Sequence, residues 1–509
     1  NDGTTDSASS YTMTVNVTAV NDAPTASNNT VTTNEDTDHT FAASEFGFTD
    51  VDGDSLDHVS IETLPSNGTL LLSGSAVSAG DQISAANISN LVFRPAANAN
   101  GASYDTFTFT VNDGTTDSAS SYTMTVNVTA VNDAPTVVND TDSVTEGGTV
   151  IETTNSAGTV LSDDSDVDGD SLTVSGTVTQ TSATDASGSS ITISSPNSAS
   201  VGSAVTGYYG QLTLDSDGTY SYVANQSNAN ALDSGESGTD VFTFTVSDGT
   251  TTTSSTITFT VNGANDAPTV VNDTDSVTEG GTVIETTNSA GTVLSDDSDV
   301  DGDSLTVSGT VTQTSATDAS GSSITISSPN SASVGSAVTG YYGQLTLDSD
   351  GTYSYVANQS NANALDSGES GTDVFTFTVS DGTTTTSSTI TFTVNGANDA
   401  PTASNNTVTT NEDTTYTFTA SDFGFSDVDG DTLSSVTVSA LSGSDGTFLL
   451  NGVAITGSTS VTKTQIDSGL LTFVPDSNEN GSSYNTFTFT VNDGTTDSAS
   501  SYTMTDNVT

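Results

Sequence analysis

The chain has 509 residues, with 64 acidic and only two basic side chains, so its formal charge at neutral pH is −62. Such a charge repels nucleic-acid phosphates and anionic membrane surfaces, and it attracts cations. The absence of cysteine excludes disulfide staples, and the absence of any 18-residue apolar run excludes membrane insertion of this segment.

A high charge with 32% hydrophobic residues is also typical of disordered chains, but the residue periodicity favours a folded one. In residues 107–111, phenylalanine and valine alternate with threonine, which is the pattern of a strand with one buried face. Turn sequences such as NDG and SDG separate these runs, and no 3.6-residue period persists. We therefore expect an all-β chain.

Residues 1–20 repeat residues 112–131 letter for letter. We therefore expect them to be the last hairpin turn and strand of a preceding repeat, cut from a longer array. A targeting segment is then expected outside these 509 residues. An alternative is that this strand completes a neighbouring molecule by strand addition.

Four repeats of two types follow, a shorter type flanking two copies of a longer one. Residues 136–268 and 269–401 are identical at all 133 positions, which indicates recent duplication and a function that tolerates changes in copy number. Stalks and lattices tolerate such changes, whereas an active site gains little from them. We name the repeats modules 1 to 4, with expected bounds 21–131, 132–264, 265–397 and 398–509.

Each module is expected to be a Greek-key β-sandwich, because its strands are short and regular. A propeller or a β-helix fits less well, because the repeat is too long for one blade or one coil. The final hairpin is the clearest element, and in module 2 its inward side chains are Phe242, Phe244, Val246, Ile257, Phe259 and Val261.

Asp506 departs from this pattern, because it occupies the inward position that Val126 has in module 1. A lone carboxylate on a buried face is costly. Fraying of the strand at a chain end, or an uncertain residue assignment, would account for it.

Every module carries the sequence DVDGD about 30 residues after the tetrapeptide NDAP. Three carboxylates at alternating positions around a glycine supply the oxygen ligands that Ca²⁺ prefers, although the loop is not an EF-hand. Asp-Gly pairs also form ordinary turns, and we expect the DSDG sequence at Asp215 to be one. Three aspartates in five residues exceed what a turn needs, so cation sites are predicted at Asp50, Asp52 and Asp54; Asp166, Asp168 and Asp170; Asp299, Asp301 and Asp303; and Asp427, Asp429 and Asp431.

The NDAPT linkers, the FxDVDGD loops and the closing TFTFTVNDG hairpins resemble the cadherin-like repeats of giant bacterial surface adhesins, of the RTX-adhesin kind. The longer modules resemble VCBS-type repeats through YGQLTLDSDGTYSYVAN and the terminal VNGANDAP. The resemblance covers essentially the whole chain. It implies tandem immunoglobulin-like or cadherin-like sandwiches in an extended rod, secreted by a Gram-negative bacterium, with Ca²⁺ making the junctions rigid.

Sandwich topology turns this resemblance into residue-level expectations. If the first strand ends at Asn34-Glu35-Asp36, that turn faces the next module, whereas DVDGD and the last hairpin turn lie at the opposite pole. The first junction is then expected to join Glu35, Asp36, Asn132, Asp133, Asp166, Asp168, Asp170 and Asp248. The second is expected to join Glu146, Asn265, Asp266, Asp299, Asp301, Asp303 and Asp381. The third is expected to join Glu279, Asn398, Asp399, Asp427, Asp429, Asp431 and Asp493.

The first copy of the loop lacks a preceding module and is expected to comprise Asn21, Asp22, Asp50, Asp52, Asp54 and Asp113. The longer modules carry Glu-Gly-Gly where the shorter ones carry Asn-Glu-Asp. One carboxylate fewer is therefore expected at the second and third junctions.

Catalysis finds little support in the sequence. The two histidines, His39 and His58, occur only in module 1 and are expected to be exposed strand or loop residues rather than bases or ligands. A serine hydrolase site lacks its base in the other modules, and no tryptophan-containing sugar cleft accompanies the paired carboxylates. We expect the protein not to be an enzyme.

The sequence thus predicts the extender region of a large extracellular bacterial adhesin, a calcium-rigidified rod for cell-surface adhesion or biofilm formation. Its expected partners are the neighbouring repeats of the same protein. The alternative is a subunit of a self-assembling filament, sheath or surface lattice, in which identical chains meet along strand edges. A ligand-binding module would need a non-repeated pocket, and only the loops around residues 64–83 and 441–464 differ enough to form one.

Overall fold

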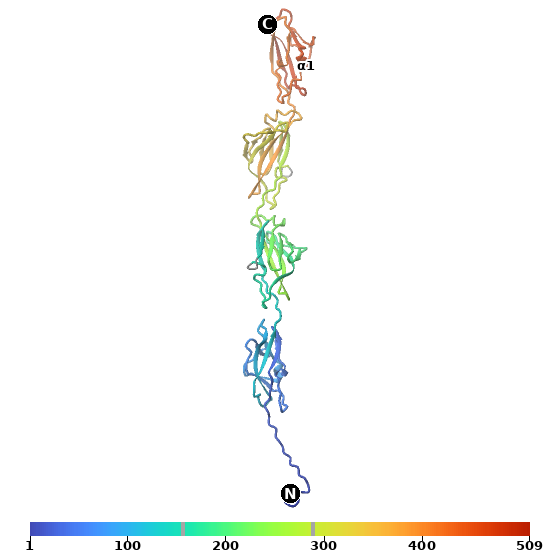
Figure 1. Ribbon diagram of the computed structural model, residues 1–509. Helices are drawn as coiled ribbons and strands as arrows, with labels where there is room; N and C mark the ends of the chain where they lie inside the picture. The colour runs from blue at the N-terminus through green and yellow to red at the C-terminus, as the bar shows by residue number, and fades with distance from the viewer. Residues whose placement is uncertain (154–157, 287–290) are drawn as a thin grey trace. The chain divides into compact units, whose positions relative to one another are not determined.

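The computed structural model describes residues 1–153, 158–286 and 291–509. Two compact units make up the chain, residues 1–226 with 238–261 and residues 227–237 with 262–509. Nearly all regular structure is β-strand, and each module contains two facing sheets (Figure 1). The prediction of an all-β chain of sandwiches is confirmed. Among the described residues, no helix is long and apolar enough to cross a membrane.

Module 1, in the first unit, packs a five-stranded sheet against a four-stranded one. Its strands are β1 (Asn29–Asn34), β2 (His39–Thr40), β3 (His58–Ile61), β4 (Thr69–Leu72), β5 (Ser75–Ala76), β6 (Gln82–Ser84), β7 (Leu91–Arg94), β8 (Gly101–Asn112) and β9 (Tyr122–Thr129), with short 3-10 helices η1 (Ala43–Phe46) and η2 (Ala85–Asn90). The sheet orders are β1-β9-β8-β3-β6 and β2-β7-β4-β5. The first strand runs parallel to the last, with Val31 opposite Val126.

The core of module 1 lies between these sheets and follows the alternation in the sequence. Phe107, Phe109 and Val111 on β8 are at most 1% exposed, while the threonines between them point outward. The ring of Phe46 meets that of Phe109 edge-on at 4.9 Å. Burying each such side chain stabilises the fold by about 2 kcal/mol, so the alternating strands supply the main driving force.

Module 2 has the same two-layer plan with longer strands. They are β10 (Asp140–Thr145), β11 (Thr149–Glu152), β12 (Thr173–Thr184), β13 (Ser190–Ile191), β14 (Ser198–Ser200), β15 (Val205–Thr206), β16 (Gln211–Leu214), β17 (Tyr220–Val223), β18 (Ser237–Ser247) and β19 (Thr252–Asn262). One sheet has the order β10-β19-β18-β12-β13, with β14 also on β12, and the other β11-β17-β16-β15. The predicted final hairpin is β18 with β19, and the predicted turn at Asp215 joins β16 to β17 through a Gly218 N–H bond to the Asp215 carbonyl of 3.0 Å.

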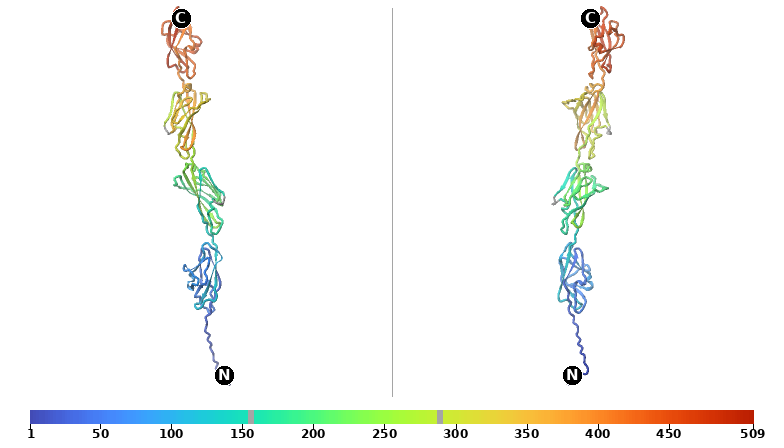
Figure 2. Two further views of the ribbon diagram at one scale, coloured as in Figure 1. Left: turned by 90° about the vertical axis from the view of Figure 1, so that its left-hand side faces the viewer. Right: turned by 45° about the vertical axis from the view of Figure 1, so that its right-hand side comes forward.

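Module 3, in the second unit, repeats these elements. Its strands are β20 (Asp273–Thr278), β21 (Thr282–Glu285), β22 (Thr306–Thr317), β23 (Ser323–Ile324), β24 (Ser331–Ser333), β25 (Val338–Thr339), β26 (Gln344–Leu347), β27 (Tyr353–Val356), β28 (Ser370–Ser380) and β29 (Thr385–Asn395). Its two sheets are seen from two further directions in Figure 2.

Module 4 completes the second unit and follows the plan of module 1. Its elements are β30 (Asn406–Thr410), β31 (Tyr416–Thr417), η3 (Ala420–Phe423), β32 (Ser435–Val438), β33 (Thr447–Leu450), β34 (Val453–Ala454), β35 (Thr459–Thr462), α1 (Lys463–Asp467), β36 (Leu471–Val474), β37 (Gly481–Asn492) and β38 (Tyr502–Val508). The five-stranded sheet has the order β30-β38-β37-β32-β35.

A buried aspartate on the long strand before the final turn anchors a loop in modules 1 to 3. In module 2 it is Asp240, which is fully buried and accepts hydrogen bonds from the backbone N–H groups of Tyr208, Tyr209 and Gly210 at 2.9 to 3.1 Å. The hydroxyl of Tyr222 adds a fourth bond of 2.7 Å. Because every oxygen is satisfied, this carboxylate stabilises the core instead of disrupting it.

Asp105 plays this part in module 1, where it accepts bonds from the N–H groups of Ser66, Asn67 and Gly68. Burial alone raises the pKa of Asp105, but the backbone N–H groups outweigh it and lower the pKa overall. Module 4 has Asn485 at the equivalent position, and its Oδ1 accepts a 3.0 Å bond from the N–H of Gly443.

Asp506 lies on β38 in a fully paired strand, so the expected fraying is wrong. It stands opposite Val408 on one side and Asn485 on the other, and it is 1% exposed. Neither carboxylate oxygen has a hydrogen-bond partner among the described residues. Burial therefore raises the pKa of Asp506 to about 7.

His39 and His58 lie in strands β2 and β3, but the expectation that they are exposed is wrong. Only 16% and 15% of these side chains is exposed. His39 Nε2 lies 3.3 Å from Glu45 Oε2, and His58 Nδ1 lies 2.8 Å from Asp57 Oδ2. Each imidazole packs beside a carboxylate, which a strand at the rim of a sandwich allows.

We expect Asp105→Ala to destabilise module 1 by roughly 3 kcal/mol, because three backbone N–H groups of one loop lose their shared acceptor. Asn485→Ala in module 4 should cost less, about 2 kcal/mol, because Asn485 makes two bonds to the facing loop, accepting the N–H of Gly443 and donating to the carbonyl of Asp445. Hydrogen–deuterium exchange of the intact chain measures both, since the peptides of modules 1 and 4 differ in sequence. Equal losses for the two variants would contradict the anchoring role of the carboxylate.

We expect Asp506→Val to stabilise module 4, and more so at high pH. The folded pKa lies near 7, above the usual value of 3.8, so stability is lost as pH rises between these values. The advantage of the valine variant should therefore grow by about 3 kcal/mol from pH 5 to pH 8. Hydrogen exchange of the β38 peptide at the two pH values measures it, and an advantage independent of pH would argue against a buried titrating carboxyl.

Candidate metal centres in the acidic loops

The DVDGD loop curls around its first aspartate in every module. In module 1, Asp50 Oδ1 accepts the N–H groups of Asp52 at 2.8 Å and Asp54 at 3.1 Å. Gly53 between them has a φ of 86°, which an L side chain rarely adopts, so glycine is needed for this turn. The carboxylates of the three aspartates consequently come within 4.8 Å of one another, and those of Asp166, Asp168 and Asp170 do the same.

The second carboxylate oxygen of the first aspartate, Oδ2, does not take part in these hydrogen bonds. It is buried and has no hydrogen-bond partner in the part of the chain that the structure describes, in all four modules: Asp50, Asp166, Asp299 and Asp427. A buried carboxylate oxygen without a donor is costly unless a cation meets it. This atom is the feature of the loop that a turn does not explain.

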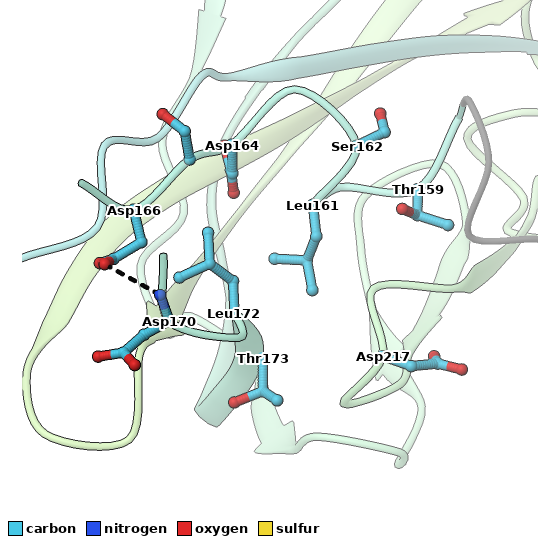
Figure 3. A pocket seen from close by; sticks show the side chains of 10 residues that line it. Thr159, Leu161, Ser162, Asp164, Asp166, Asp170, Leu172, Thr173 and Asp217 are labelled. Atoms are coloured by element: carbon cyan, nitrogen blue, oxygen red, sulfur yellow. Dashed lines mark hydrogen bonds between the residues drawn. The ribbon is translucent and has the colours of Figure 1, made fainter. Parts of the chain in front are cut away.

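In module 2 the loop borders an open hollow of about 430 Å³ (Figure 3). Asp166 and Asp170 lie together at one side of it, and the backbone N–H of Asp170 donates to Asp166 Oδ1. Asp217 lies across the hollow. Leu161 and Leu172 separate them. The hollow thus concentrates negative charge at the DVDGD side.

The NDAP linker docks on this loop through its backbone. Asp133 N–H donates to Asp168 Oδ2 at 2.8 Å in module 2, and Asp399 N–H donates to Asp429 Oδ2 at 2.7 Å in module 4. The corresponding donors in modules 1 and 3 are Asp22 and Asp266, on Asp52 and Asp301 at 2.7 Å. The threonine after the linker proline forms an isolated β-bridge with the residue directly before DVDGD, which fixes the direction from which the linker approaches.

The linker asparagine clamps the last hairpin turn to the same end of the module. Its Nδ2 donates to a turn aspartate at 2.9 to 3.2 Å, in the pairs Asn21 with Asp113, Asn132 with Asp248, Asn265 with Asp381 and Asn398 with Asp493. The three loops predicted to share one pole therefore meet there.

The aspartates of the last hairpin turn differ from the DVDGD aspartates because hydrogen-bond donors already surround their carboxylates. Asp248 accepts from the hydroxyl and N–H of Thr251, the N–H of Thr250 and the amide of Asn132. The Thr251 hydroxyl contributes most to lowering the pKa of Asp248. With its lone pairs engaged, this carboxylate holds the loops together and is a weaker candidate ligand than the DVDGD aspartates.

In the first unit, carboxylates of module 1 reach the linker of module 2. Glu35 follows β1, is 3% exposed, and accepts the N–H of Val131 at 2.5 Å. The pKa of Asp133 is raised first by burial and then by four carboxylates, those of Asp168, Asp36, Glu35 and Asp166. No base enters this group within the described residues, so the carboxylates repel one another.

In the second unit, the third junction has the same character. Glu279 Oε1 accepts the N–H of Ala397 at 2.7 Å, and its Oε2 is buried without a partner among the described residues. Burial contributes most to raising the pKa of Asp429, followed by the carboxylates of Asp399, Asp427 and Asp366. The pKa of Asp431 is likewise raised, first by burial and then by the charges of Asp366, Asp427 and Asp493.

One carboxylate fewer was expected at the third junction, but Asp366 supplies a further one there. This residue was not predicted from the sequence. Its counterpart Asp233 lies in the second unit with Asp266, Asp301 and Asp303. The pKa of Asp303 is raised mainly by burial, and the charge of Asp233 is the second largest cause. Glu146, predicted for this second junction, belongs to the first unit and follows β10. The longer modules thus carry an acidic residue on the loop before β18 and β28.

A signal for these residues exists in the sequence. Counting back from the shared Phe-Thr-Phe of the long strand aligns Asp233 with Asn98 of module 1. The N–H of Asn98 donates to Asp36 Oδ1 at 3.1 Å, so the two positions occupy the same end of the fold. The second carboxylate has moved from the turn after β1 in the shorter modules to this loop in the longer ones.

The longer modules also bury a carboxylate that was not predicted. In module 2, Asp140 on β10 lies near Asp163 and Asp164, and burial followed by these two charges raises its pKa to about 7. Asp273 of module 3 behaves in the same way. A group that holds a proton near neutrality lowers the repulsion beside the DVDGD loop.

The arrangement at the module ends is suited to binding hard cations. It offers carboxylate oxygens from two or three loops, some of them buried without donors, and backbone contacts that preset their positions. Carboxylates with raised pKa values retain protons more readily, so cation binding there releases protons.

Comparison with known proteins places these modules in families. Residues 132–263 and 265–396 match the model of the bacterial cadherin-like domain, and residues 21–129 and 398–505 match that of a bacterial Ig domain. No curated protein sequence matches the chain significantly.

Similar solved structures include protocadherin gamma B7 extracellular cadherin domains 1–4, at 12% identity and a TM-score of 0.39, covering 94% of this chain and 100% of that one. Drosophila N-cadherin EC1–4 has 9% identity and a TM-score of 0.25, with 89% and 92% covered. An endo-fucoidan hydrolase of glycoside hydrolase family 107 has 19% identity and a TM-score of 0.19; the match covers 70% of this chain and 41% of that chain. These TM-scores are too low to carry an argument, so the assignment rests on the family models.

Because the cadherin-like model matches more than half of its residues, this chain belongs to the bacterial cadherin-like domain family, and it carries bacterial Ig domains as well.

Proposed function

We propose that this chain is an extender segment of a large extracellular bacterial adhesin, and that Ca²⁺ bound at its module junctions makes it a stiff rod for cell-surface adhesion or biofilm formation. The modules are proposed to be non-catalytic spacers. Their partners are the neighbouring modules of the same protein.

One observation carries this proposal, namely the group of carboxylates from consecutive modules around a single linker. At the third junction, Glu279 and Asp366 from module 3 lie within electrostatic reach of Asp429 in module 4. On both sides lie buried oxygens that have no donor among the residues the structure describes, at Glu279 Oε2 and Asp429 Oδ1. Such a group is unstable without a counter-charge, and the chain has only two basic side chains to offer.

Ca²⁺ fits these residues because it takes six to eight oxygen ligands at flexible geometry. When bound, it would supply positive charge and fix the ligand directions. The DVDGD aspartates and the preceding glutamate would hold it, while the turn aspartate and the linker asparagine keep the three loops together. Replacing repulsion by shared ligation ties one module to the next, which restrains the hinge at the linker.

The composition agrees with an extracellular setting. Without disulfides, metal ligation is the remaining strong cross-link available to a chain of small secreted domains. Duplication of a whole module without change also suits a spacer, because adding a copy lengthens it without altering any junction.

We expect removal of Ca²⁺ with EDTA to loosen the junctions, because the carboxylates then repel one another. Small-angle scattering of the intact chain should show a broader distribution of lengths, and proteases should cut in the NDAP linkers. Restoring Ca²⁺ should reverse both effects, whereas NaCl of equal ionic strength should not. Identical scattering and proteolysis with and without the chelator would refute the proposal.

We expect Asp366→Asn to weaken calcium binding at the third junction by roughly tenfold, because one negative charge is lost beside the carboxylates that would hold the ion. Asp445→Asn is the matched control, since Asp445 is exposed on the same unit and belongs to no junction. Calorimetric titration of the intact chain should show one class of sites displaced in the first variant alone. An unchanged titration for Asp366→Asn would remove Asp366 from the site.

A further inference from the structure

Three acidic side chains come together where the first strand of each longer module begins. In module 2 they are Asp140, the first residue of β10, and Asp163 and Asp164, which precede the DVDGD loop. The charges that act on Asp140 are those of Asp163 and Asp164, and those of the DVDGD aspartates are not among them. We call this set the strand-start group. In module 3 it consists of Asp273, Asp296 and Asp297.

Two carboxylate oxygens of this group are buried and lack a donor among the residues that the structure describes. They are Asp140 Oδ2 and Asp164 Oδ2, each of which exposes less than 1 Å² to solvent. Asp273 Oδ2 and Asp297 Oδ2 repeat this in module 3. The other oxygen of Asp164 accepts the N–H of Val138 at 2.8 Å, which holds this carboxylate in position. Such oxygens are costly to bury unless a cation meets them.

The shorter modules have an amide where the longer ones have the first of these carboxylates. Counted from the linker proline, Asn29 of module 1 and Asn406 of module 4 occupy the place of Asp140. Asn29 Nδ2 donates to the carbonyl of Glu45 at 2.8 Å. Asn406 Nδ2 donates to the carbonyl of Asp422 at 2.9 Å. An ionised carboxylate has no hydrogen to donate, so the longer modules need a different partner at this position.

The neighbouring positions differ between the module types in the same sense. Counted back from DVDGD, module 1 has Gly47 and Phe48 where module 2 has Asp163 and Asp164. The longer modules therefore gain three negative charges at one place, and their sequences contain no lysine, arginine or histidine. The positive charge that balances this group has to come from solution. One proton neutralises only one of the three carboxylates, whereas a divalent cation contacts several at once.

We propose that each longer module binds a divalent cation of the Ca²⁺ type, between Asp140 and Asp164 in module 2 and between Asp273 and Asp297 in module 3. Asp163 adds a third charge from its exposed position. Waters and backbone carbonyls complete the oxygen shell of the ion. Asp164 borders the open hollow of Figure 3, which gives the ion a route from solvent.

Such an ion joins the start of β10 to the segment before DVDGD within one module. The site is separate from the junctions of the proposed function, because no residue of a neighbouring module takes part in it. The chain then has two kinds of cation site, one shared between consecutive modules and one inside each longer module. The second kind stabilises the module itself, because the ion binds the folded arrangement of the carboxylates.

The number of bound ions tests this site. Asp140→Asn with Asp273→Asn gives both longer modules the asparagine of the shorter ones, so the fold should persist. Equilibrium dialysis of the intact chain against Ca²⁺, with the metal measured by mass spectrometry, should show a loss of about two ions per chain, one from each longer module. Asp217→Asn with Asp350→Asn is the control, because these aspartates are exposed and the change in charge is equal. The control should lose no ion.

An unchanged number of ions in Asp140→Asn with Asp273→Asn would overturn the proposal, and a proton alone would then balance the group. Asp166→Asn with Asp299→Asn tests the DVDGD loops separately. If only this second pair loses ions, the site in the strand-start group is refuted and the proposed function stands. A chain that binds no Ca²⁺ would refute both.

Tb³⁺ luminescence locates the ions. Tb³⁺ replaces Ca²⁺ at oxygen sites and emits when a nearby aromatic ring transfers energy to it, and the chain has no tryptophan to compete with tyrosine. Burial contributes most to raising the pKa of Tyr220, and the charge of Asp140 is among the further causes, so this ring lies near the site. Tyr353 has the same relation to Asp273 in module 3.

Tyr220→Phe with Tyr353→Phe should therefore lower the Tb³⁺ emission of the intact chain without lowering the number of bound ions. Tyr208→Phe with Tyr341→Phe is the control, because these rings pack against other tyrosines, and it should leave the emission unchanged. Unchanged emission in the first pair would overturn the placement of the ion beside Asp140.

Discussion

Carboxylates close to one another, with almost no bases to balance them, are the constraint on which the rest of this molecule depends. Two negative charges within a few ångströms raise the energy of both, and burial raises it further. The fold meets this problem with three different devices. Backbone N–H groups surround Asp240, burial raises the pKa of Asp506 and so favours its neutral form, and the module ends present open oxygens that a cation would satisfy.

The first two devices are internal to a module, and they explain why a chain of this charge still forms packed cores. Asp240 is useful to the core because it ties a loop to the long strand. Asp506 has no such use, since no group in the described part of the chain donates to it. The contrast shows that the cost of a buried carboxylate is decided by the donors around it rather than by burial itself.

The open carboxylate oxygens at the module ends face the junction with the next module. The two module types place their second carboxylate on different loops, after β1 in module 1 and before β28 in module 3, yet both bring it to the same end of the sandwich. A junction that keeps its charge while its residues change position is consistent with a requirement on the total charge there rather than on one side chain. The same ends hold the linker by backbone bonds, so the carboxylates are positioned before any ion arrives.

The all-β class, the final hairpins and the acidic loops could be predicted from the sequence, because alternation and turn residues act locally, over a few positions. The repeats also made the sister modules predictable from one another. The sequence did not identify Asp366 and Asp233 as junction residues, and it misplaced the histidines, because their surroundings come from loops distant in the chain. The folded chain was needed to show that donors saturate the turn aspartates, while one oxygen of Asp50 has no donor among the described residues. That distinction depends on which N–H groups the folded backbone points at each carboxylate, and no local pattern specifies it.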